Sequence, residues 1–421
     1  MDTTLQTLMR EATRLTQAGR LNDATQAIQR ALGGVAGTPL TPTAPPTRSR
    51  VFTGGGATTA AMRRGAALIL DGCVFETGAR STETQQPVQP PPQYADVDGG
   101  TFTGASYTHA GLTRNYKLYT PPASATSGRP SALVVMLHGC TQNPDDFAAG
   151  TNMNTMADEQ GFMVLYPEQS QKANPSRCWN WFKHNHQRRG SGEPALIATL
   201  AQMVAHEHGI DPRRVYIAGL SAGAAMAAVV AAAYPEVFAA VGVHSGLPGG
   251  AATNVAEALA LMKSGGGNGG MGGGMGAGIV GGAGLGGGGF GAQGSKATPA
   301  ALAVPTIVFH GDQDQTVHPR NGEQVLAAAL TGQATGSTTS VSGMSGEGTV
   351  EQGVSDRGRR YTRSVYLDGS GAPLAEHWVV HGAGHAWSGG TANGSYTDVT
   401  GPDASREMLR FFFSQPHGKP H

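Results

Sequence analysis

The sequence contains few charged residues and no surplus of either sign. Charged side chains make up 14% of its 421 residues, with 29 Lys and Arg against 29 Asp and Glu. Nucleic-acid-binding proteins depend on a field of positive charge, so this balance argues against a nucleic-acid partner. Long apolar runs are absent too, and no run is long enough to cross a bilayer. The composition is that of a globular protein without a transmembrane segment.

Cysteine is also scarce. Three cysteines cannot form a disulfide framework, and their odd number agrees with a reducing compartment. No cluster of His and Cys has the spacing of a zinc site, so we expect no metal. A secretory signal is not recognisable either, because Met1-Asp2 opens with an acid and no apolar core of signal length follows before Gly33. We therefore expect a cytoplasmic protein.

Glycine, in contrast, is abundant, with 64 residues, and it is concentrated in one segment. Nineteen of the thirty residues 265–294 are glycine. The segment has no charge and no periodicity, so its few apolar side chains cannot repay the entropy of ordering it. We expect a mobile insertion in a surface loop; the alternative is a lid that helps to hold an apolar substrate.

The first 100 residues differ from the rest of the chain. Apolar residues recur at helical spacing on both sides of Gly19, which predicts a helical hairpin over residues 1–33. A lone hairpin buries its apolar stripes poorly, so we expect it to dock on the chain, self-associate or bind a hydrophobic surface. Residues 34–100 are rich in Pro, Thr and Gly and predict a linker with one apolar island at residues 67–70. Residues 101–414 are expected to form one α/β domain.

A serine lies at a sharp turn between a predicted strand and a predicted helix. The turn is Gly219-Leu220-Ser221-Ala222-Gly223, preceded by the strand-like run 215–218 and followed by the alanine-rich run 224–233. Small neighbours are what so tight a turn requires, and the pattern predicts a nucleophile elbow with Ser221 at its tip. A serine hydroxyl is a weak nucleophile at neutral pH, so a base, an orienting acid and oxyanion donors must lie elsewhere.

Two carboxylates compete for the role of the acid. Residues 304–311 predict a buried strand, and Asp312 and Asp314 follow at its carboxyl end, where open α/β sheets carry their chemistry. Asp314 is favoured because an Asp followed by x-x-Val is the arrangement that hydrolases of this type use. The structural alternative is that both aspartates cap a turn.

The base is predicted in the loop after the last expected strand, residues 378–380. His385 lies between Gly384 and Ala386 with no apolar face around it, and His381 is the nearest rival. The chain order Ser221, Asp314, His385 is that of α/β-hydrolases. We therefore expect the α/β-hydrolase fold, with a mostly parallel central sheet flanked by helices.

Oxyanion donors are expected from two backbone amides. One is the N–H of Ala222, directly after the nucleophile. The other comes from the loop after the apolar run 132–137, where we assign the Cys140 N–H and keep the Thr141 N–H as the alternative.

Six motifs in order resemble the PHB depolymerase-type esterase family over about residues 100–413. They are Leu137-His138-Gly139-Cys140-Thr141-Gln142, Tyr166-Pro167-Glu168-Gln169, Cys178-Trp179-Asn180-Trp181, Gly219-Leu220-Ser221-Ala222-Gly223, His244-Ser245-Gly246 and Gly384-His385-Ala386-Trp387-Ser388-Gly389-Gly390. The resemblance implies a serine carboxylesterase without metal or cofactor, acting on an ester or polyester. Because many family members are exported, it also keeps an extracellular location as the alternative.

Within this resemblance, Trp179, Trp181 and Trp387 are the expected walls of the substrate pocket, since tryptophan offers a flat apolar surface. Core packing is the alternative for all three, and Asn180 is a further candidate for orienting a ligand. A bridge between Cys140 and Cys178 is a hypothesis, because both lie in motif segments near the expected pocket; Cys73 has no evident role.

Hydroxyalkanoate or short-chain ester hydrolysis ranks ahead of feruloyl or acetylxylan ester cleavage, because plant cell-wall substrates lie outside the cell and no signal is visible. A peptidase or thioesterase of the same fold would share the triad. A non-catalytic protein that binds polymer granules, through residues 1–33 and the glycine-rich segment, is the alternative from another class.

Overall fold

The computed structural model describes residues 68–70, 73–75, 100–126, 132–265, 300–336, 348–369 and 371–415. The chain divides into two units, residues 1–64 and 65–421, and all described residues belong to the second. The expected hairpin of residues 1–33, most of the expected linker, and the glycine-rich segment beyond Gly265 lie outside the described residues.

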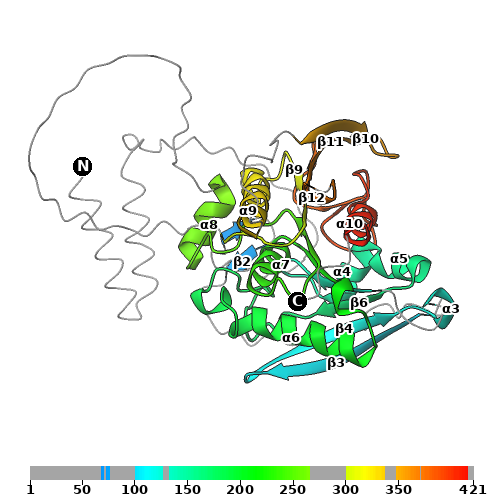
Figure 1. The fold of residues 1–421 in the computed structure, drawn as a ribbon. Coiled ribbons are helices and arrows are strands. Elements are labelled where there is room, and N and C mark those ends of the chain that lie inside the picture. Colours follow the sequence, from blue (N-terminus) through cyan, green and yellow to red (C-terminus); the bar gives the residue numbers. More distant parts are fainter. Residues whose placement is uncertain are drawn as a thin grey trace, which may run out of the picture. The chain divides into compact units, whose positions relative to one another are not determined.

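One ten-stranded sheet forms the centre of the described domain (Figure 1), in the order β10-β11-β12-β9-β8-β7-β5-β6-β4-β3. The six strands from β12 to β6 run parallel to one another. An antiparallel hairpin extends each edge, β3–β4 beside β6 and β10–β11 beside β12. The expectation of a mostly parallel sheet is confirmed.

The sheet strands are β3 Thr101–His109, β4 Leu112–Thr120, β5 Leu133–Leu137, β6 Met163–Pro167, β7 Val215–Leu220, β8 Ala240–His244, β9 Thr306–Gly311, β10 Thr349–Val354, β11 Arg360–Leu367 and β12 Pro373–Val380. Two short pairs are separate from it: β1 Leu68–Leu70 with β2 Cys73–Phe75, and β13 Trp387–Ser388 with β14 Thr397–Asp398. The helices are α3 Ala123–Thr126, α4 Pro144–Thr151, α5 Met153–Gln160, α6 Gly192–Glu207, α7 Ala222–Ala233, α8 Val255–Ser264, α9 Arg320–Gly336 and α10 Ala404–Phe413, with 3₁₀ turns η1 His184–His186 and η2 Pro212–Arg214.

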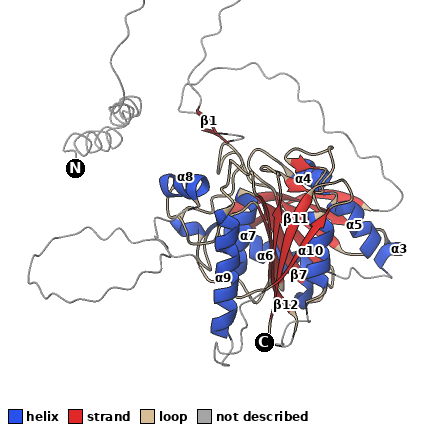
Figure 2. Cartoon of the chain, turned by 90° about the horizontal axis from the view of Figure 1, so that it is seen from above, coloured by secondary structure: helices blue, strands red, loops and turns tan. Residues whose placement is uncertain are grey.

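Helices cover both faces of the sheet (Figure 2), with α6, α7, α8 and α9 on one side and α4, α5 and α10 on the other. The alternation along β5 shows how the strands serve both layers. Leu133, Val135 and Leu137 pack in the core beneath α6 and α7, whereas Val134 and Met136 pack beneath α4, α5 and α10. A strand buried on both faces must be apolar at every position, and this accounts for the continuous run seen in the sequence.

The strands expected over 215–218, 304–311 and 378–380 are present, but β7 extends to Leu220, β9 begins at Thr306 and β12 begins at Pro373. The hairpin of β3 and β4 was not expected. Strands β10 and β11 were not expected either, because their residues are exposed or half-buried and their polar sequence contains no apolar run. The helix after the nucleophile begins at Ala222, two residues earlier than its alanine-rich run suggested. The apolar island in the expected linker forms the β1–β2 pair, because a strand needs a partner to satisfy its backbone.

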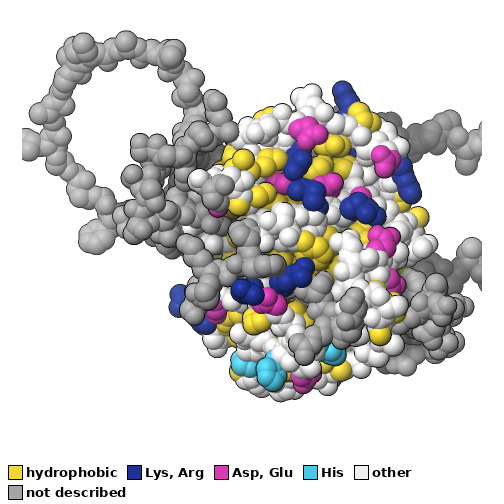
Figure 3. Space-filling model, turned by 45° about the vertical axis from the view of Figure 1, so that its right-hand side comes forward, with side chains coloured by type: hydrophobic (Ala, Val, Ile, Leu, Met, Phe, Trp, Pro, Cys, Tyr) yellow, Lys and Arg dark blue, Asp and Glu magenta, His cyan; other side chains and the backbone are white. Residues whose placement is uncertain are grey.

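Charges are distributed without a field of one sign. On the face drawn in Figure 3, Lys and Arg side chains lie among Asp and Glu side chains. Among the helices that the structure describes, none is both long and apolar enough to pass through a membrane.

A buried carboxylate joins the last strand of the parallel sheet to its neighbours. Glu376 on β12 has no exposed surface and accepts hydrogen bonds from the Arg363 guanidinium on β11, at 2.9 and 3.1 Å, and from Arg410 on α10, at 2.6 Å. The Trp378 indole N–H donates to the same carboxylate at 3.1 Å. Burial by itself would raise the pKa of Glu376, but these arginines hold it below its usual value.

Replacing Glu376 by Ala is therefore expected to destabilise the fold. It leaves Arg363 and Arg410 without their shared partner, and breaking a buried pair costs about 3 kcal/mol. Glu351→Ala is the matched control, because Glu351 bonds the same Arg363 from an exposed position, where a pair is worth at most ~1 kcal/mol. Urea unfolding followed by circular dichroism measures both; equal losses in the two variants would contradict the role given to Glu376.

Candidate active site

The predicted nucleophile stands on a strained backbone. Ser221 has φ 58° and ψ −121°, a conformation that residues other than glycine rarely adopt. The turn is held because the Ser221 N–H donates to the His244 carbonyl on β8 at 2.9 Å and the Ser221 carbonyl accepts from Ala225 at 2.9 Å. The tight turn at Ser221 that the sequence pattern predicted is present.

The flanking glycines are required by close backbone approach. A Cβ on Gly219 would lie 2.5 Å from the Gly223 carbonyl carbon. A Cβ on Gly223 would lie 2.1 Å from the Leu137 carbonyl oxygen, at the end of β5. Any larger residue at position 223 would push the start of α7 away from that strand.

The favoured base and acid are hydrogen-bonded to each other. His385 Nδ1 lies 2.8 Å from Asp314 Oδ2, and the exposed fractions of the two side chains are 12% and 0%. Because Nδ1 faces the carboxylate, Nε2 is the ring nitrogen left for proton transfer. Ser221 is also buried, at 7% exposed.

The two rival residues form a second pair of the same kind. His381 Nδ1 lies 2.9 Å from Asp312 Oδ2, and the His381 Nε2 contacts the Thr362 hydroxyl at 2.8 Å. Both ring nitrogens of His381 are therefore engaged, and the pair is about a third exposed, 36% and 33%. His381 therefore has no free ring nitrogen to activate a serine, and the structure does not favour His381 and Asp312 as base and acid.

Asp314 is held in its ionised form by several donors. Its Oδ1 accepts from the Thr316 and Val317 amides at 2.9 and 2.8 Å, and His310 Nε2 lies 3.5 Å from Oδ2. Burial acts to raise the pKa of Asp314, but the bonds with His310 and His385 outweigh it and hold the pKa well below its usual range. A permanently charged carboxylate is what a histidine base needs beside it.

In the loop after β5, the Cys140 backbone amide differs from its neighbours Gly139, Thr141 and Gln142, which all donate hydrogen bonds. The Thr141 N–H donates to the Ser176 carbonyl at 2.7 Å, the Gly139 N–H to Gln142 Oε1 at 2.9 Å, and the Gln142 N–H to the Gly139 carbonyl at 3.4 Å. In the described part of the chain, no acceptor is found for the Cys140 N–H. Between the two donors expected from the sequence, the geometry therefore favours Cys140 over Thr141.

His138 braces this loop. It is fully buried; Nδ1 contacts the Gly139 carbonyl at 2.7 Å, and Nε2 accepts from the Gln169 amide at 3.1 Å. Burial is the main cause that lowers the pKa of His138 to about 4. The ring is therefore neutral at pH 7, with Nδ1 as donor and Nε2 as acceptor.

Cys140 is bonded to Cys178 by a disulfide. The sequence left this bridge as a hypothesis, and the structure contains it. Through the disulfide, the backbone that carries the Cys140 N–H is tied to the segment that contains Trp179 and Asn180.

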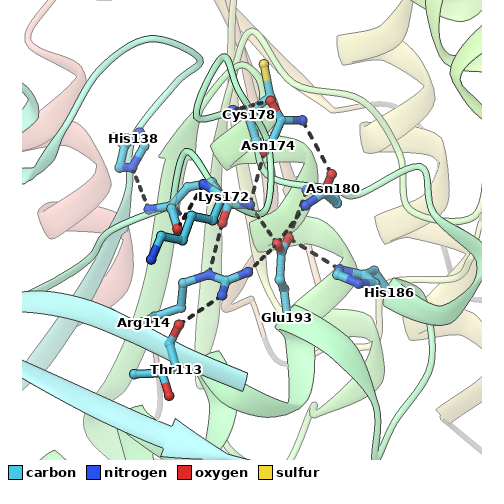
Figure 4. Close-up of polar contacts among 11 residues, drawn as sticks. Thr113, Arg114, His138, Lys172, Asn174, Cys178, Asn180, His186 and Glu193 are labelled. Atoms are coloured by element: carbon cyan, nitrogen blue, oxygen red, sulfur yellow. Dashed lines mark hydrogen bonds and ion pairs between the residues drawn. The ribbon is translucent and has the colours of Figure 1, made fainter. Parts of the chain in front are cut away.

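That segment is in turn fastened to a buried carboxylate, Glu193, in the first turn of α6 (Figure 4). Asn180 donates to Glu193 from its backbone and its side chain, both at 2.8 Å, and Arg114 on β4 donates at 3.0 Å. Gln169 donates at 2.6 Å, and His186 Nδ1 lies 3.4 Å away. Burial would raise the pKa of Glu193, but these bonds, with His186 the largest contributor, lower it to about 2.

The loop that carries His385 has a similar brace from β8. His244 Nε2 accepts from the Ser388 amide at 3.0 Å, and its ring stacks on Trp387 with centroids 5.0 Å apart. Burial first, and then the nearby His310 and His385, lower the pKa of His244 to about 3, so the ring stays neutral and can accept this bond.

The three tryptophans predicted as pocket walls are buried. Trp179, Trp181 and Trp387 are 0%, 3% and 1% exposed. The Trp387 indole donates to the Ser405 hydroxyl at 3.0 Å, and its ring meets Phe147 edge to face. The geometry thus favours the core-packing alternative, and substrate contact by these residues stays a prediction. The side chain of Asn180 likewise forms hydrogen bonds within the protein, donating to Glu193 and accepting from Asn174.

Sequence reasoning missed the supporting residues Arg114, Glu193 and His310. Glu193 begins a helix with Pro194 next to it, and an acid in a first helical turn is usually interpreted as favourable to the helix dipole. Only its complete burial reveals another role. Among the described residues, no group of three or more His, Cys, Asp or Glu could hold a metal ion.

Comparison with known proteins concerns the family that the chain resembles. A family model described as Esterase PHB depolymerase matches residues 114–272. The chain is 33% identical to poly(3-hydroxyalkanoate) depolymerase C of Paucimonas lemoignei over 262 residues, 62% of this chain and 56% of that protein. It is 28% identical to poly(3-hydroxybutyrate) depolymerase of Ralstonia pickettii over 317 residues, 72% and 56% respectively. The chain thus spans about half the length of these two relatives.

Among solved structures, an acetyl xylan esterase from Aspergillus awamori matches with a TM-score of 0.50 at 18% identity, covering 74% of this chain and 99% of that one. At that identity the likeness concerns the fold alone, and it confirms the α/β-hydrolase architecture.

Removing the disulfide is expected to slow turnover without unfolding the protein. In Cys178→Ser the Cys140 amide remains but loses its covalent brace, so kcat for p-nitrophenyl butyrate should fall ~10-fold, within the ~100-fold cost of losing an oxyanion donor. KM should change less than kcat. Cys73→Ser is the control and should retain wild-type values. A folded Cys178→Ser protein with wild-type kcat would contradict the role of the bridge.

Stability should fall in mild acid because of the buried histidines. The pKa values of His138, His244 and His377 are lowered to about 4, 3 and 4, whereas in the unfolded chain each titrates near 6.5. The unfolded state therefore binds more protons below pH 6.5, and each histidine costs about 2 kcal/mol at pH 5 relative to pH 7. Urea midpoints between pH 7 and 5 measure this. In His244→Gln and in His377→Gln, the urea midpoint should change less between pH 7 and pH 5 than in the wild type. A wild-type change of the midpoint in both variants would contradict the role given to the buried histidines.

Proposed function

We propose that this chain, which belongs to the PHB depolymerase-type esterase family, is a serine carboxylesterase that uses Ser221, His385 and Asp314. The family relationship supports ester hydrolysis as the reaction. The roles given to the three residues are supported by the geometry of the site.

The observation that carries the proposal is the His385–Asp314 hydrogen bond of 2.8 Å, on the same edge of the sheet as the strained Ser221 turn. Strands β7, β9 and β12 are parallel members of one sheet, and Ser221, Asp314 and His385 each follow the carboxyl end of one of them. Loops at that edge meet in space, which is where open α/β sheets carry out chemistry.

The proposed reaction has two halves. His385, oriented by Asp314, takes the Ser221 proton through Nε2 as the hydroxyl oxygen attacks the ester carbonyl carbon. The Cys140 and Ala222 amides bind the oxyanion; Ala222 is the first residue of α7, so its N–H has no acceptor within the helix. The alcohol departs with the proton from His385. A water molecule activated by the same histidine then attacks the acyl-enzyme and releases the carboxylic acid.

For the substrate, we propose hydroxyalkanoate esters or short-chain esters. The two relatives named above are depolymerases of poly(3-hydroxyalkanoate) and poly(3-hydroxybutyrate). Their further length leaves open which part of them contacts polymer. Self-association or granule contact through residues 1–33 stays a prediction, as that segment lies outside the described residues.

The disulfide bears on where the protein works. Disulfides persist in oxidising compartments and are rare in the cytosol. The Cys140–Cys178 bridge therefore favours the extracellular alternative over the cytoplasmic expectation drawn from the sequence.

Replacing Ser221 by Ala is expected to remove nearly all turnover, since no other group supplies the nucleophile. The loss should reach about 10⁶-fold and leave only the residual rate that the oxyanion donors and substrate binding provide. The test is a panel of p-nitrophenyl butyrate, amorphous polyhydroxybutyrate, methyl ferulate and acetylated xylan. Ser264→Ala is the control, because its hydroxyl is exposed and bonds only its own helix. An active Ser221→Ala enzyme, or a wild type inactive on all four substrates, would overturn the proposal.

A further inference from the structure

A cavity lies at the edge of the sheet that carries the candidate active site, and its lining contains none of the residues assigned to the cleavage. It has a volume of about 810 Å³ and opens at the turn between β10 and β11. Its lining includes Asp312, Val354, Arg357, Arg359, Arg360 and His381. None of these residues takes part in the proposed ester cleavage.

The topology places this cavity at the same edge of the sheet as Ser221. Strands β10 and β11 are antiparallel, as are β11 and β12, whereas β12 and β9 are parallel. The end of β10, the start of β11 and the ends of β12 and β9 therefore share one edge. Asp312 precedes Asp314 by two residues, so the Cα atoms of these two lie within about 7 Å of each other. Gly382, also in the lining, precedes His385 by three residues, so the Cα atoms of that pair lie within about 11 Å.

The cavity carries unpaired positive charge. Asp312 is occupied by His381 and the Gly382 amide, and Arg359 is paired with Asp398 at 3.2 Å. Arg357 and Arg360 are exposed, and neither has a carboxylate within ion-pair distance in the described part of the chain. Arg357 makes one bond, to the Val399 carbonyl at 3.3 Å.

The nearby acids do not cancel these charges within the cavity. Glu351 on β10 is bonded to Arg363, and Asp356, in the same turn as Arg357, is not part of the lining. Beside the two guanidinium groups lies the side chain of Val354, which is 61% exposed. The cavity thus offers two donors suited to a carboxylate and an aliphatic surface next to them.

We propose that this cavity binds the terminal carboxylate of a hydroxyacid oligomer whose ester bond lies at Ser221. The proposal rests on the proposed function, and it makes the substrate class of that site more specific. Every ester cleavage in a polyester creates a new carboxylate end, so such ends accumulate as the reaction proceeds. A site for them would direct the enzyme to short acidic oligomers.

Strand β11 lies four strands from β7 in the sheet, about 19 Å at ~4.8 Å per strand, so the substrate must be long enough to span that distance. The test compares two substrates that differ only at this end, the linear hexamer of 3-hydroxybutyrate as free acid and as methyl ester. The full chain should prefer the acid by ~5-fold in kcat/KM at low salt, as expected of two exposed ion pairs. In the Arg357→Gln/Arg360→Gln variant the preference should disappear through a higher KM for the acid. Turnover of the methyl ester and of p-nitrophenyl butyrate should stay within about twofold of wild type, since those substrates lack the carboxylate.

Arg189→Gln/Arg406→Gln is the matched control, because it removes the same charge from exposed positions outside the cavity. It should retain the preference. A wild type without preference for the acid, a cavity variant that keeps it, or a cavity variant that loses both substrates equally would each overturn the proposal.

A binding measurement separates this proposal from the proposed function. Calorimetric titration of the acid hexamer into Ser221→Ala should show binding, weakened ~5-fold when Arg357 and Arg360 are also replaced by Gln. Arginine-dependent binding without wild-type ester hydrolysis would sustain the cavity and overturn the esterase. Hydrolysis without any arginine dependence would do the opposite.

Discussion

The site depends on one close approach, that of the first turn of α7 to the end of β5. Gly223 has no room for a side chain there, because its Cα faces the Leu137 carbonyl. The same contact sets two things at once: it holds Ser221 in its strained conformation, and it places the loop after Leu137, with the Cys140 amide, beside it. The proposed nucleophile and the proposed oxyanion donor are therefore positioned by a single packing constraint rather than by two independent ones.

Buried carboxylates then secure the segments that packing alone would leave loose. Asp314, Glu193 and Glu376 have side chains with no exposed surface. Each has at least one partner from a segment distant in the sequence: His385 for Asp314, Arg114 for Glu193 and Arg410 for Glu376. A buried charge is costly without partners, so each carboxylate commits its neighbours to one arrangement. Two of the three act near the chemistry, and the third joins β12 to β11 and α10.

The two His–Asp pairs consist of the same groups but differ in burial and in whether the second ring nitrogen of the histidine is free. Asp314 and His385 are buried, and His385 keeps one nitrogen free for the reaction. Asp312 and His381 are partly exposed, and Thr362 takes the second nitrogen of His381. The first pair serves the proposed cleavage, and the second forms part of the wall of the arginine-lined cavity.

The sequence alone was sufficient to predict the fold class and to name the candidate triad. Continuous apolar runs require strands buried on both faces, a glycine-flanked serine requires a tight turn, and the order of Ser221, Asp314 and His385 matches that architecture. Only the tertiary structure decided the burial of the three tryptophans, the formation of the Cys140–Cys178 bridge and the role of Glu193. Each depends on which groups from distant segments meet and on how much water is excluded between them, and local patterns carry no information about either.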